Sequence, residues 1–204
     1  MASSLYFILP ALGGYTLTSL YLLKNPQILH KKKRAAFHCT HISHRGGRYS
    51  TGTDRKFTLL EEVFRKFPKM PINIEIKEDN SLLMEKVSNM VKQYDREDLT
   101  VWATVDSTIM KKCCRTNSTM PYSFSMRRGL QLLLLYYSGL LPFVPLGESF
   151  LQFYLPRIIN RCVHLFVCNE DPDIEAAFEA GATGVMTDYP TLLTNYLHRH
   201  RNQD

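Results

Sequence analysis

The sequence predicts an α/β fold that is preceded by a membrane-spanning helix. Segments with the period of a strand alternate with segments of helical spacing through most of the chain. This order indicates a parallel sheet covered by helices, either an open sheet or a β/α barrel. Residues 5–23 carry no charge, and as a helix these 19 residues span roughly 28 Å, close to a hydrocarbon core. The chain has 204 residues, 45% hydrophobic and 22% charged, which suits one domain with an appendage and excludes wholesale disorder.

The apolar run near the N-terminus is typical of an uncleaved anchor. A signal peptide would place Lys or Arg before the run, and residues 1–4 contain neither. The positive charges come afterwards, at Lys24 and in the Lys-Lys-Lys-Arg run at 31–34, so this side is expected to face the cytoplasm and to contact anionic headgroups. A cleaved signal and a buried core helix are the alternatives. We therefore expect a single-pass anchor with a basic flank at residues 1–34.

A second apolar run covers residues 129–146. It follows Arg127-Arg128 and contains Pro142 and Pro145. A proline inside a helix costs about 3 kcal/mol, so a straight span through the whole run is not expected. The pattern predicts a helix at roughly 129–140 that dips into the membrane, and a buried barrel element is the alternative. Because the apolar character continues, we expect a membrane-contacting insert at about 129–155.

The remaining elements follow from hydrophobic spacing and from the residues that stop a helix. The expected helices lie at 59–67, 82–94, 107–114, 173–180 and 191–198. The expected strands lie at 71–77, 99–103, 122–124, 165–168 and 185–187.

The strand at 71–77 has polar residues at every second position. Its three isoleucines alternate with Asn73, Glu75 and Lys77, which therefore share one face. Both faces of an open parallel sheet are buried, so charges there would be costly, whereas the mouth of a barrel can use them. A carboxylate can bind a hard divalent cation, and a lysine can contact a phosphate. The alternative is an exposed edge strand with an incidental ion pair.

The run His44-Arg45-Gly46-Gly47 places a titratable base beside a bidentate phosphate-binding group. The two glycines permit a tight turn after these side chains. This combination suits phosphodiester chemistry.

Taken together, these motifs resemble the glycerophosphodiester phosphodiesterase family, whose fold is a β/α barrel. The resemblance rests on His44-Arg45-Gly46-Gly47, Ile74-Glu75-Ile76-Lys77 and residues 181–190, which occur in that order. The anchor and residues 139–145 are similar to the membrane branch that acts as a lysophospholipase D. The resemblance implies an incomplete TIM-type (β/α) barrel at residues 35–204, in the endoplasmic reticulum or another intracellular membrane.

The resemblance also implies roles for four residues. His44 matches the first of two acid/base histidines, and Arg45 matches the residue that contacts the substrate phosphate. Glu75 matches one of three metal-ligand carboxylates, and Lys77 matches the basic partner near the phosphate. The implied cofactor is a divalent cation, Mg or Ca, and the implied substrates are lysophospholipids or glycerophosphodiesters. Asp188 is expected to shape the mouth of the site without a chemical role.

The chain also departs from the family pattern. A Glu-Asn-Thr after the His-Arg-Gly turn, a Glu-x-Asp on the next strand and a second histidine in a His-Asp pair are all missing. About 170 residues follow residue 34, whereas a barrel typically needs about 250. A second gap falls near residues 160–167. We interpret the chain as a truncated or alternatively spliced form that binds metal weakly and has little activity. A non-catalytic, membrane-attached relative is the alternative function.

Other function classes fit the sequence poorly. The net charge of +6 includes a basic cluster beside the anchor, and no basic motif with interleaved aromatic residues appears, so no nucleic-acid partner is expected. The five cysteines form no Cys-x-x-Cys pair, and we expect reduced, mostly buried thiols.

Overall fold

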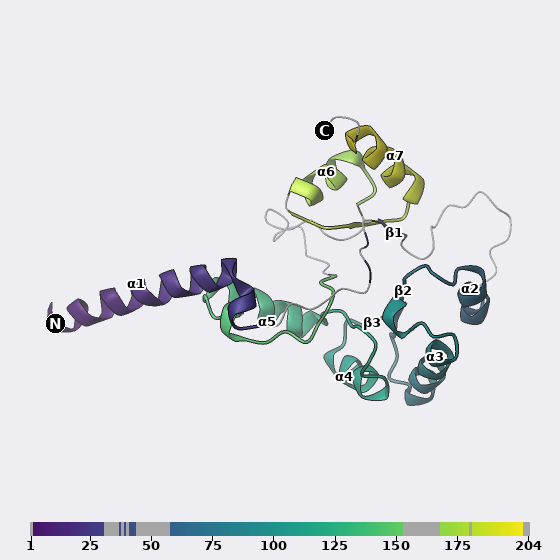
Figure 1. Cartoon of the computed structure of the whole chain (residues 1–204), viewed down its shortest axis with the longest axis horizontal. Coiled ribbons are helices and arrows are strands. Elements are labelled where there is room, and N and C mark those ends of the chain that lie inside the picture. The colour runs from purple at the N-terminus through teal and green to yellow at the C-terminus, as the bar shows by residue number, and fades with distance from the viewer. Residues whose placement is uncertain are drawn as a thin grey trace. The chain divides into compact units, whose positions relative to one another are not determined.

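The computed structural model of the chain describes residues 2–30, 37, 39, 41–43, 58–152, 168–179 and 181–201 (Figure 1). The chain divides into two compact units. The first unit contains Met1–Ala35, Asn73–Val91 and Thr100–Leu151, and the second contains Ala36–Ile72, Lys92–Leu99 and Gln152–Asp204.

The first unit begins with the long helix α1 (Ala2–Lys24), followed by the short 3-10 helix η1 (Pro26–Ile28). The helix predicted at 5–23 is therefore confirmed. Most apolar side chains of α1 are exposed, whereas Ser19 and Leu22 are buried. Within the described part of the chain, the segment Tyr6–Lys24 is the helix long and apolar enough to cross a membrane.

Two neighbouring strands, β2 (Ile72–Glu75) and β3 (Thr100–Ala103), confirm the strands predicted at 71–77 and 99–103. Ile76 extends the pairing, because its N–H donates to the carbonyl of Ala103 at 2.8 Å. The strand predicted at 122–124 forms only isolated parallel bridges, one of them between Trp102 and Tyr122. Pro121 precedes this segment and has no N–H with which to lengthen the ladder.

Helices α3 (Ser81–Gln93) and α4 (Ser107–Thr116) lie where helices were predicted. The carboxylate of Asp106 caps α4 by accepting from the backbone N–H groups of Thr108 and Ile109, at 2.6 and 3.0 Å. A cap of this kind typically contributes about 1 kcal/mol. Both helices bury apolar residues at helical spacing, namely Met84, Val87 and Val91 on α3, and Ile109, Met110 and Cys113 on α4.

The helix predicted at 129–140 is present but shifted, as α5 (Met126–Tyr137), and the 3-10 helix η4 (Leu141–Phe143) follows it. The helix starts earlier because Arg127 and Arg128 favour helix. It ends earlier because Gly139 adopts a left-handed φ of 73°, which closes the last turn.

The second unit is built around a parallel pair of strands, β1 (His41–Ser43) and β4 (Val185–Thr187), in which His41 lies opposite Val185. Helices α6 (Asp171–Glu179) and α7 (Pro190–Arg201) confirm the two helices predicted near the C-terminus. Gly181, the expected stop after α6, has a φ of 86°. Most of the strand predicted at 165–168 lies outside the described residues.

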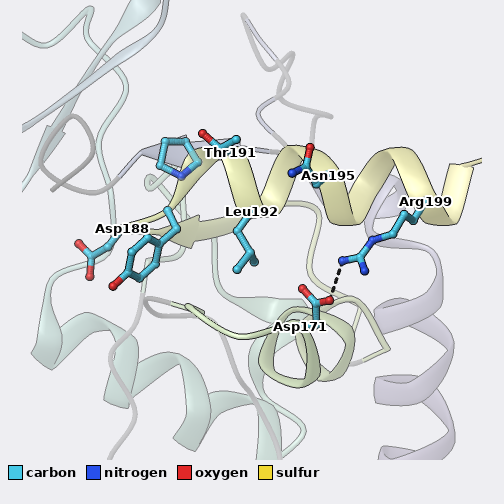
Figure 2. Close-up of a pocket in the computed structure, with 8 residues that line it drawn as sticks. Asp171, Asp188, Thr191, Leu192, Asn195 and Arg199 are labelled. Carbon is cyan, nitrogen blue, oxygen red and sulfur yellow. Dashed lines mark hydrogen bonds and ion pairs between the residues drawn. The ribbon is translucent and has the colours of Figure 1, made fainter. Parts of the chain in front are cut away.

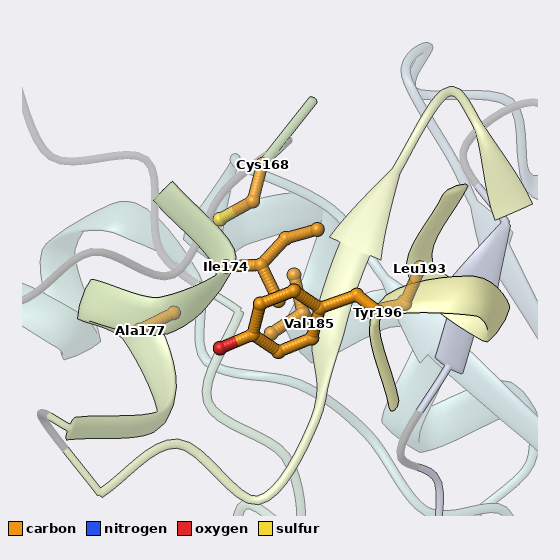
Figure 3. Packing of buried hydrophobic residues seen from close by; sticks show 6 residues of the cluster. All are labelled: Cys168, Ile174, Ala177, Val185, Leu193 and Tyr196. Carbon is orange, nitrogen blue, oxygen red and sulfur yellow. The ribbon is translucent and has the colours of Figure 1, made fainter. Parts of the chain in front are cut away.

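The core of the second unit joins these elements. Figure 3 shows the ring of Tyr196 beside Ile174 and Val185. The N–H of Cys168 donates to the carbonyl of Met186 at 2.8 Å, which ties this buried residue to β4. The cluster consists of Cys168, Ile174, Ala177, Val185, Leu193 and Tyr196.

A buried arginine holds the loop after α2 (Leu60–Lys66), the helix predicted at 59–67. Arg96 is only 2% exposed, and it precedes the 3-10 helix η3 (Glu97–Leu99). Its guanidinium donates to the carbonyls of Phe67, Pro68 and Met70 and lies 4.7 Å from the centre of the Phe64 ring. Burial lowers the pKa of Arg96. Arg96 therefore supplies hydrogen-bond donors to three loop carbonyls.

The structure confirms a mixed α/β class with an apolar N-terminal helix. Among the described residues, the named strands form two sheets of two strands each. The TIM-type barrel remains a prediction.

Candidate functional site

Two of the predicted site residues lie close together in the first unit. Burial alternates along β2 as predicted, so Glu75 and Lys77 emerge on the side opposite the isoleucines. Lys77 Nζ lies 3.5 Å from Glu75 Oε2, and the two side chains are 68% and 46% exposed. An exposed ion pair of this length contributes little to stability, about 1 kcal/mol at most. Both side chains are therefore accessible to a ligand.

The described residues do not by themselves fit a divalent cation. Mg or Ca needs several oxygen ligands, and Glu75 offers one carboxylate that already faces Lys77. In the portion of the chain that the structure describes, no three His, Cys, Asp or Glu side chains gather as a metal site would require.

The other two predicted site residues, His44 and Arg45, lie outside the described residues. The strand that leads to them is described, and Ser43 lies opposite Thr187 in the parallel pair of β1 and β4. Parallel strands end at the same edge of a sheet. Ser43 and Thr187 therefore lie at the same edge of this sheet. In the sequence, they directly precede His44 and Asp188.

Asn169 organises this edge, which sequence reasoning did not anticipate. Its side-chain oxygen accepts from the Thr187 hydroxyl at 3.1 Å and from the backbone N–H of Asp188 at 3.0 Å. Its amide nitrogen donates to Asp188 Oδ2 at 3.1 Å. The available signal was an asparagine directly after the strand predicted at 165–168, and an asparagine there is also typical of an ordinary loop. Asn169 therefore holds both the backbone and the side chain of Asp188 in place.

A cavity of about 760 Å³ opens beside Asp188 in the second unit (Figure 2). On its far side, Arg199 pairs with Asp171 at 2.6 Å, so these two charges are mutually compensated. The lining residues are Asp171, Asp188, Tyr189, Pro190, Thr191, Leu192, Asn195 and Arg199.

Of the described cysteines, Cys113 and Cys168 are buried and Cys114 is half-buried. Cys113, Cys114 and Cys168 form no disulfide, which agrees with the expectation of reduced cysteines. Burial raises the pKa of Cys113 and of Cys168 to about 11. Since only a thiolate is a good nucleophile, these two residues are not suited to nucleophilic catalysis at neutral pH.

Comparison with known proteins decides the family. No family model matches the chain. The chain is 30% identical to lysophospholipase D GDPD3 of Homo sapiens, with 98% of this chain and 98% of that protein covered. It is 32% and 31% identical to lysophospholipase D GDPD1 of Rattus norvegicus and Homo sapiens, with 97% of this chain and 98% of each relative covered. The chain belongs to the glycerophosphodiester phosphodiesterase family, in its lysophospholipase D-like membrane branch. At the level of the family, its function is that of a lipid phosphodiesterase.

The alignments also bear on the predicted gaps. They run over 311 and 308 residues, whereas this member of the family has 204 residues. The relatives therefore contain stretches with no counterpart here, although both chains are covered almost from end to end. This agrees with the expectation that internal segments of the family domain are missing.

Proposed function

We propose that this chain is a membrane-attached phosphoric diester hydrolase of lipid metabolism, with lysophospholipids or glycerophosphodiesters as substrates. Water would split the phosphodiester into a phosphate monoester and an alcohol. The products are a lysophosphatidic-type acid or glycerol phosphate, together with the headgroup alcohol. The main support is the nearly complete coverage by lysophospholipase D proteins.

Four residues are proposed to act on the substrate. His44 would move a proton, as a general acid or base does. Arg45 and Lys77 would bind the phosphate, and Lys77 is exposed enough to reach it. Glu75 would contribute to binding of a divalent cation, Mg or Ca, which supplies Lewis-acid chemistry when bound. Because the described residues give this cation few ligands, we expect weak metal binding and slow turnover.

Residues 35–204 are proposed to form an incomplete TIM-type (β/α) barrel, with the anchor at 1–34 and the membrane-contacting insert at about 129–155. The pairing of β1 with β4 supports this proposal. These are the first and last strands that the structure describes, and a barrel closes when its first and last strands pair. We place the protein in the endoplasmic reticulum or another intracellular membrane.

The test is hydrolysis of lysophosphatidylcholine by the purified full chain in detergent, with Mg or Ca supplied and choline release measured. We expect slow, cation-dependent release that disappears in His44→Ala and Glu75→Gln. Glu78→Gln is the matched control, because Glu78 is an exposed carboxylate three residues after Glu75. Unchanged release in His44→Ala or Glu75→Gln would contradict the assigned roles.

A second candidate function is a non-catalytic relative that binds lipid at the membrane. The observation that favours it is the small number of metal ligands around Glu75, because no three His, Cys, Asp or Glu side chains gather among the described residues. In that case the chain would bind lysophosphatidylcholine without releasing choline, and added cations would change neither result. Equilibrium binding of the lipid, measured beside choline release, separates the two candidates.

A further inference from the structure

Side chains of α1 and of the segment after it contact the turn that follows α5. The Tyr15 hydroxyl donates to the carbonyl of Ser138 at 2.5 Å, and the Ser19 hydroxyl donates to the carbonyl of Gly139 at 2.6 Å. His30 Nε2 lies 2.7 Å from the carbonyl oxygen of Pro142. The last carbonyls of a helix have no partner within the helix. Side chains more than a hundred residues away in the sequence thus supply bonds that water would otherwise make.

Gly139 makes this contact possible. Its φ of 73° is one that side-chain-bearing residues rarely adopt. A Cβ atom at this position would lie 3.0 Å from the Ser19 hydroxyl oxygen and 3.1 Å from the Tyr15 hydroxyl oxygen. The backbone conformation therefore favours glycine, and a side chain here would also crowd the two hydroxyl groups.

The turn lies at a depth where water is scarce if α1 crosses a membrane. Tyr15 precedes Lys24 by nine positions, which is about 14 Å of helix. That distance is near the middle of a hydrocarbon core about 30 Å thick. Carbonyls at this depth must be paired within the protein. The bonds from Tyr15 and Ser19 meet this requirement.

The outward surface of the same segments is apolar. Leu134 and Tyr137 on α5 are 71% and 75% exposed, and Leu140 and Phe143 near η4 are also exposed. Large exposed apolar surfaces mark sites of contact with proteins or membranes. Since α1 presents its own exposed apolar side chains next to η4, a lipid surface fits this face best.

The opposite end of α5 is basic. A cavity of about 670 Å³ between α4 and α5 is lined by Lys111, Arg115, Arg127 and Arg128, and among the described lining residues Glu148 is the one carboxylate. Glu148 is bound to Arg128, whose Nε lies 2.6 Å from Glu148 Oε1. The described part of the lining thus has a net positive charge. Arg127 precedes Ser138 by about 17 Å of helix, which is close to half the thickness of a bilayer.

We propose that α5 and η4 form a re-entrant membrane element that is held by α1. Tyr15 and Ser19 keep the apolar turn at Ser138 and Gly139 within the hydrocarbon layer. The basic cavity at the start of α5 binds the phosphate groups of anionic lipids at the membrane surface. The proposal depends on insertion of α1 and on no step of hydrolysis.

The depth of α5 is tested by fluorescence quenching in the full chain. Tyr137→Trp introduces an indole at an exposed position of α5, and the single native tryptophan, Trp102, is fully buried and gives the baseline. The protein is reconstituted into vesicles of phosphatidylcholine brominated on its acyl chains, with phosphatidylserine added. We expect the indole at position 137 to be quenched clearly above the baseline. Quenching equal to that of the unsubstituted protein would overturn the proposal.

The role of α1 is tested in the same protein by Tyr15→Phe together with Ser19→Ala. Each hydrogen bond between helices in lipid changes an equilibrium constant by about threefold. The double change should therefore move the equilibrium between inserted and withdrawn α5 about tenfold toward the withdrawn state, which reduces the quenching. Thr16→Val is the matched control, because the Thr16 hydroxyl bonds to the carbonyl of Leu12 within α1. Equal quenching in the double variant and the control would show that α1 does not hold the turn. Carbonate extraction of the double variant verifies that α1 is still inserted.

The basic cavity is tested by the combined substitution Lys111→Gln, Arg115→Gln and Arg127→Gln. Phosphatidylserine should increase quenching at position 137 in the parent, and this increase should vanish in the triple variant. The reason is that each Lys or Arg near an anionic surface raises the affinity for the membrane about fivefold. Lys86→Gln with Lys92→Gln, on exposed positions of α3, is the control. A phosphatidylserine effect that persists in the triple variant would overturn this part of the proposal.

Discussion

Ser43 lies opposite Thr187 in the parallel pair that joins the first and last described strands of the chain. Thr187 is fully buried, and its hydroxyl donates to Asn169 while it accepts from the backbone N–H of Tyr189 at 3.0 Å. The end of β4 is thus fixed by side-chain bonds as well as by the strand pairing.

Asn169→Ala should destabilise the second unit by about 1–3 kcal/mol. The change leaves the buried Thr187 hydroxyl and the backbone N–H of Asp188 without their acceptor, and an unsatisfied polar group carries a cost of that size. The measurement is urea denaturation followed by circular dichroism. Asn195→Ala, on the exposed side of α7, should change the free energy of unfolding by less than about 0.5 kcal/mol. Equal effects in both variants would contradict the assigned role of Asn169.

Arg96→Met should cost about 3–5 kcal/mol, because it leaves three loop carbonyls without their donor, and each unsatisfied buried polar group costs about 1–3 kcal/mol. Arg96→Lys should recover only part of this loss, since an ammonium lacks the planar fork of the guanidinium. Arg65→Met is the control, because Arg65 is exposed and its ion pair with Glu61 is a surface pair. The free energy of unfolding in urea distinguishes the three variants, and a loss in Arg65→Met as large as that in Arg96→Met would be evidence against the structure of this loop.

The sequence predicted the local elements well and the long-range contacts poorly. The alternation along β2 and the helical spacing of α3 and α4 are local patterns, and the structure confirms them. The earlier end of α5 depended on the conformation of Gly139, which α1 contacts from far away in the sequence. Burial of Arg96 and the bonds of Asn169 were missed for the same reason, because their partners are set by folding and not by spacing.

The candidate site was predicted only in part. The shared face of Glu75 and Lys77 followed from the two-residue period of a strand, and the structure has both side chains there. Their ion pair matches the alternative considered for an exposed strand, and spacing alone did not distinguish it from a ligand site. The roles of His44 and Arg45 remain predictions.

The stability of the first unit should fall on acidification through the Arg128–Glu148 pair. Burial is the largest single influence and raises the pKa of Glu148. The hydrogen bonds from Arg128 and from the backbone N–H groups of Gly147 and Glu148, together with the charge of Arg128, outweigh it, so the net pKa lies below the ordinary value of 4.5. A carboxyl group whose pKa is lowered by folding stabilises the folded state at pH values above its pKa in the unfolded chain. This stabilisation is lost as the pH falls through the pKa of the group in the folded state. Denaturation midpoints between pH 7 and pH about 3 should therefore decline, and less steeply in Glu148→Gln. The same slope in Glu148→Gln as in the parent would assign the decline to other carboxylates.

Alkaline carbonate washing should leave the intact chain in the membrane pellet. The segment Tyr6–Lys24 has the length and apolar character of a span, and its side chains are mostly exposed in the folded chain. Deletion of residues 1–23 should leave partial association through α5 and η4, which keep exposed apolar side chains of their own. Release of the intact chain into the supernatant would exclude the anchor, and complete solubility of the deletion variant would exclude a second membrane contact.

Glu75→Gln should separate chemistry from folding. The carboxylate faces Lys77 in an exposed pair at 3.5 Å, so its loss should change the free energy of unfolding by less than about 1 kcal/mol. General acid–base and metal-assisted steps contribute about 10²-fold or more to hydrolysis, so choline release by the same variant should fall by at least about 100-fold if Glu75 binds a cation. Lys77→Met frees the Glu75 carboxylate from its partner. Choline release should then need less Mg or Ca, while binding of the substrate phosphate should weaken. A Glu75→Gln variant that loses stability and activity in proportion would make Glu75 a structural residue, and the cation would then have to be bound by other residues of the chain.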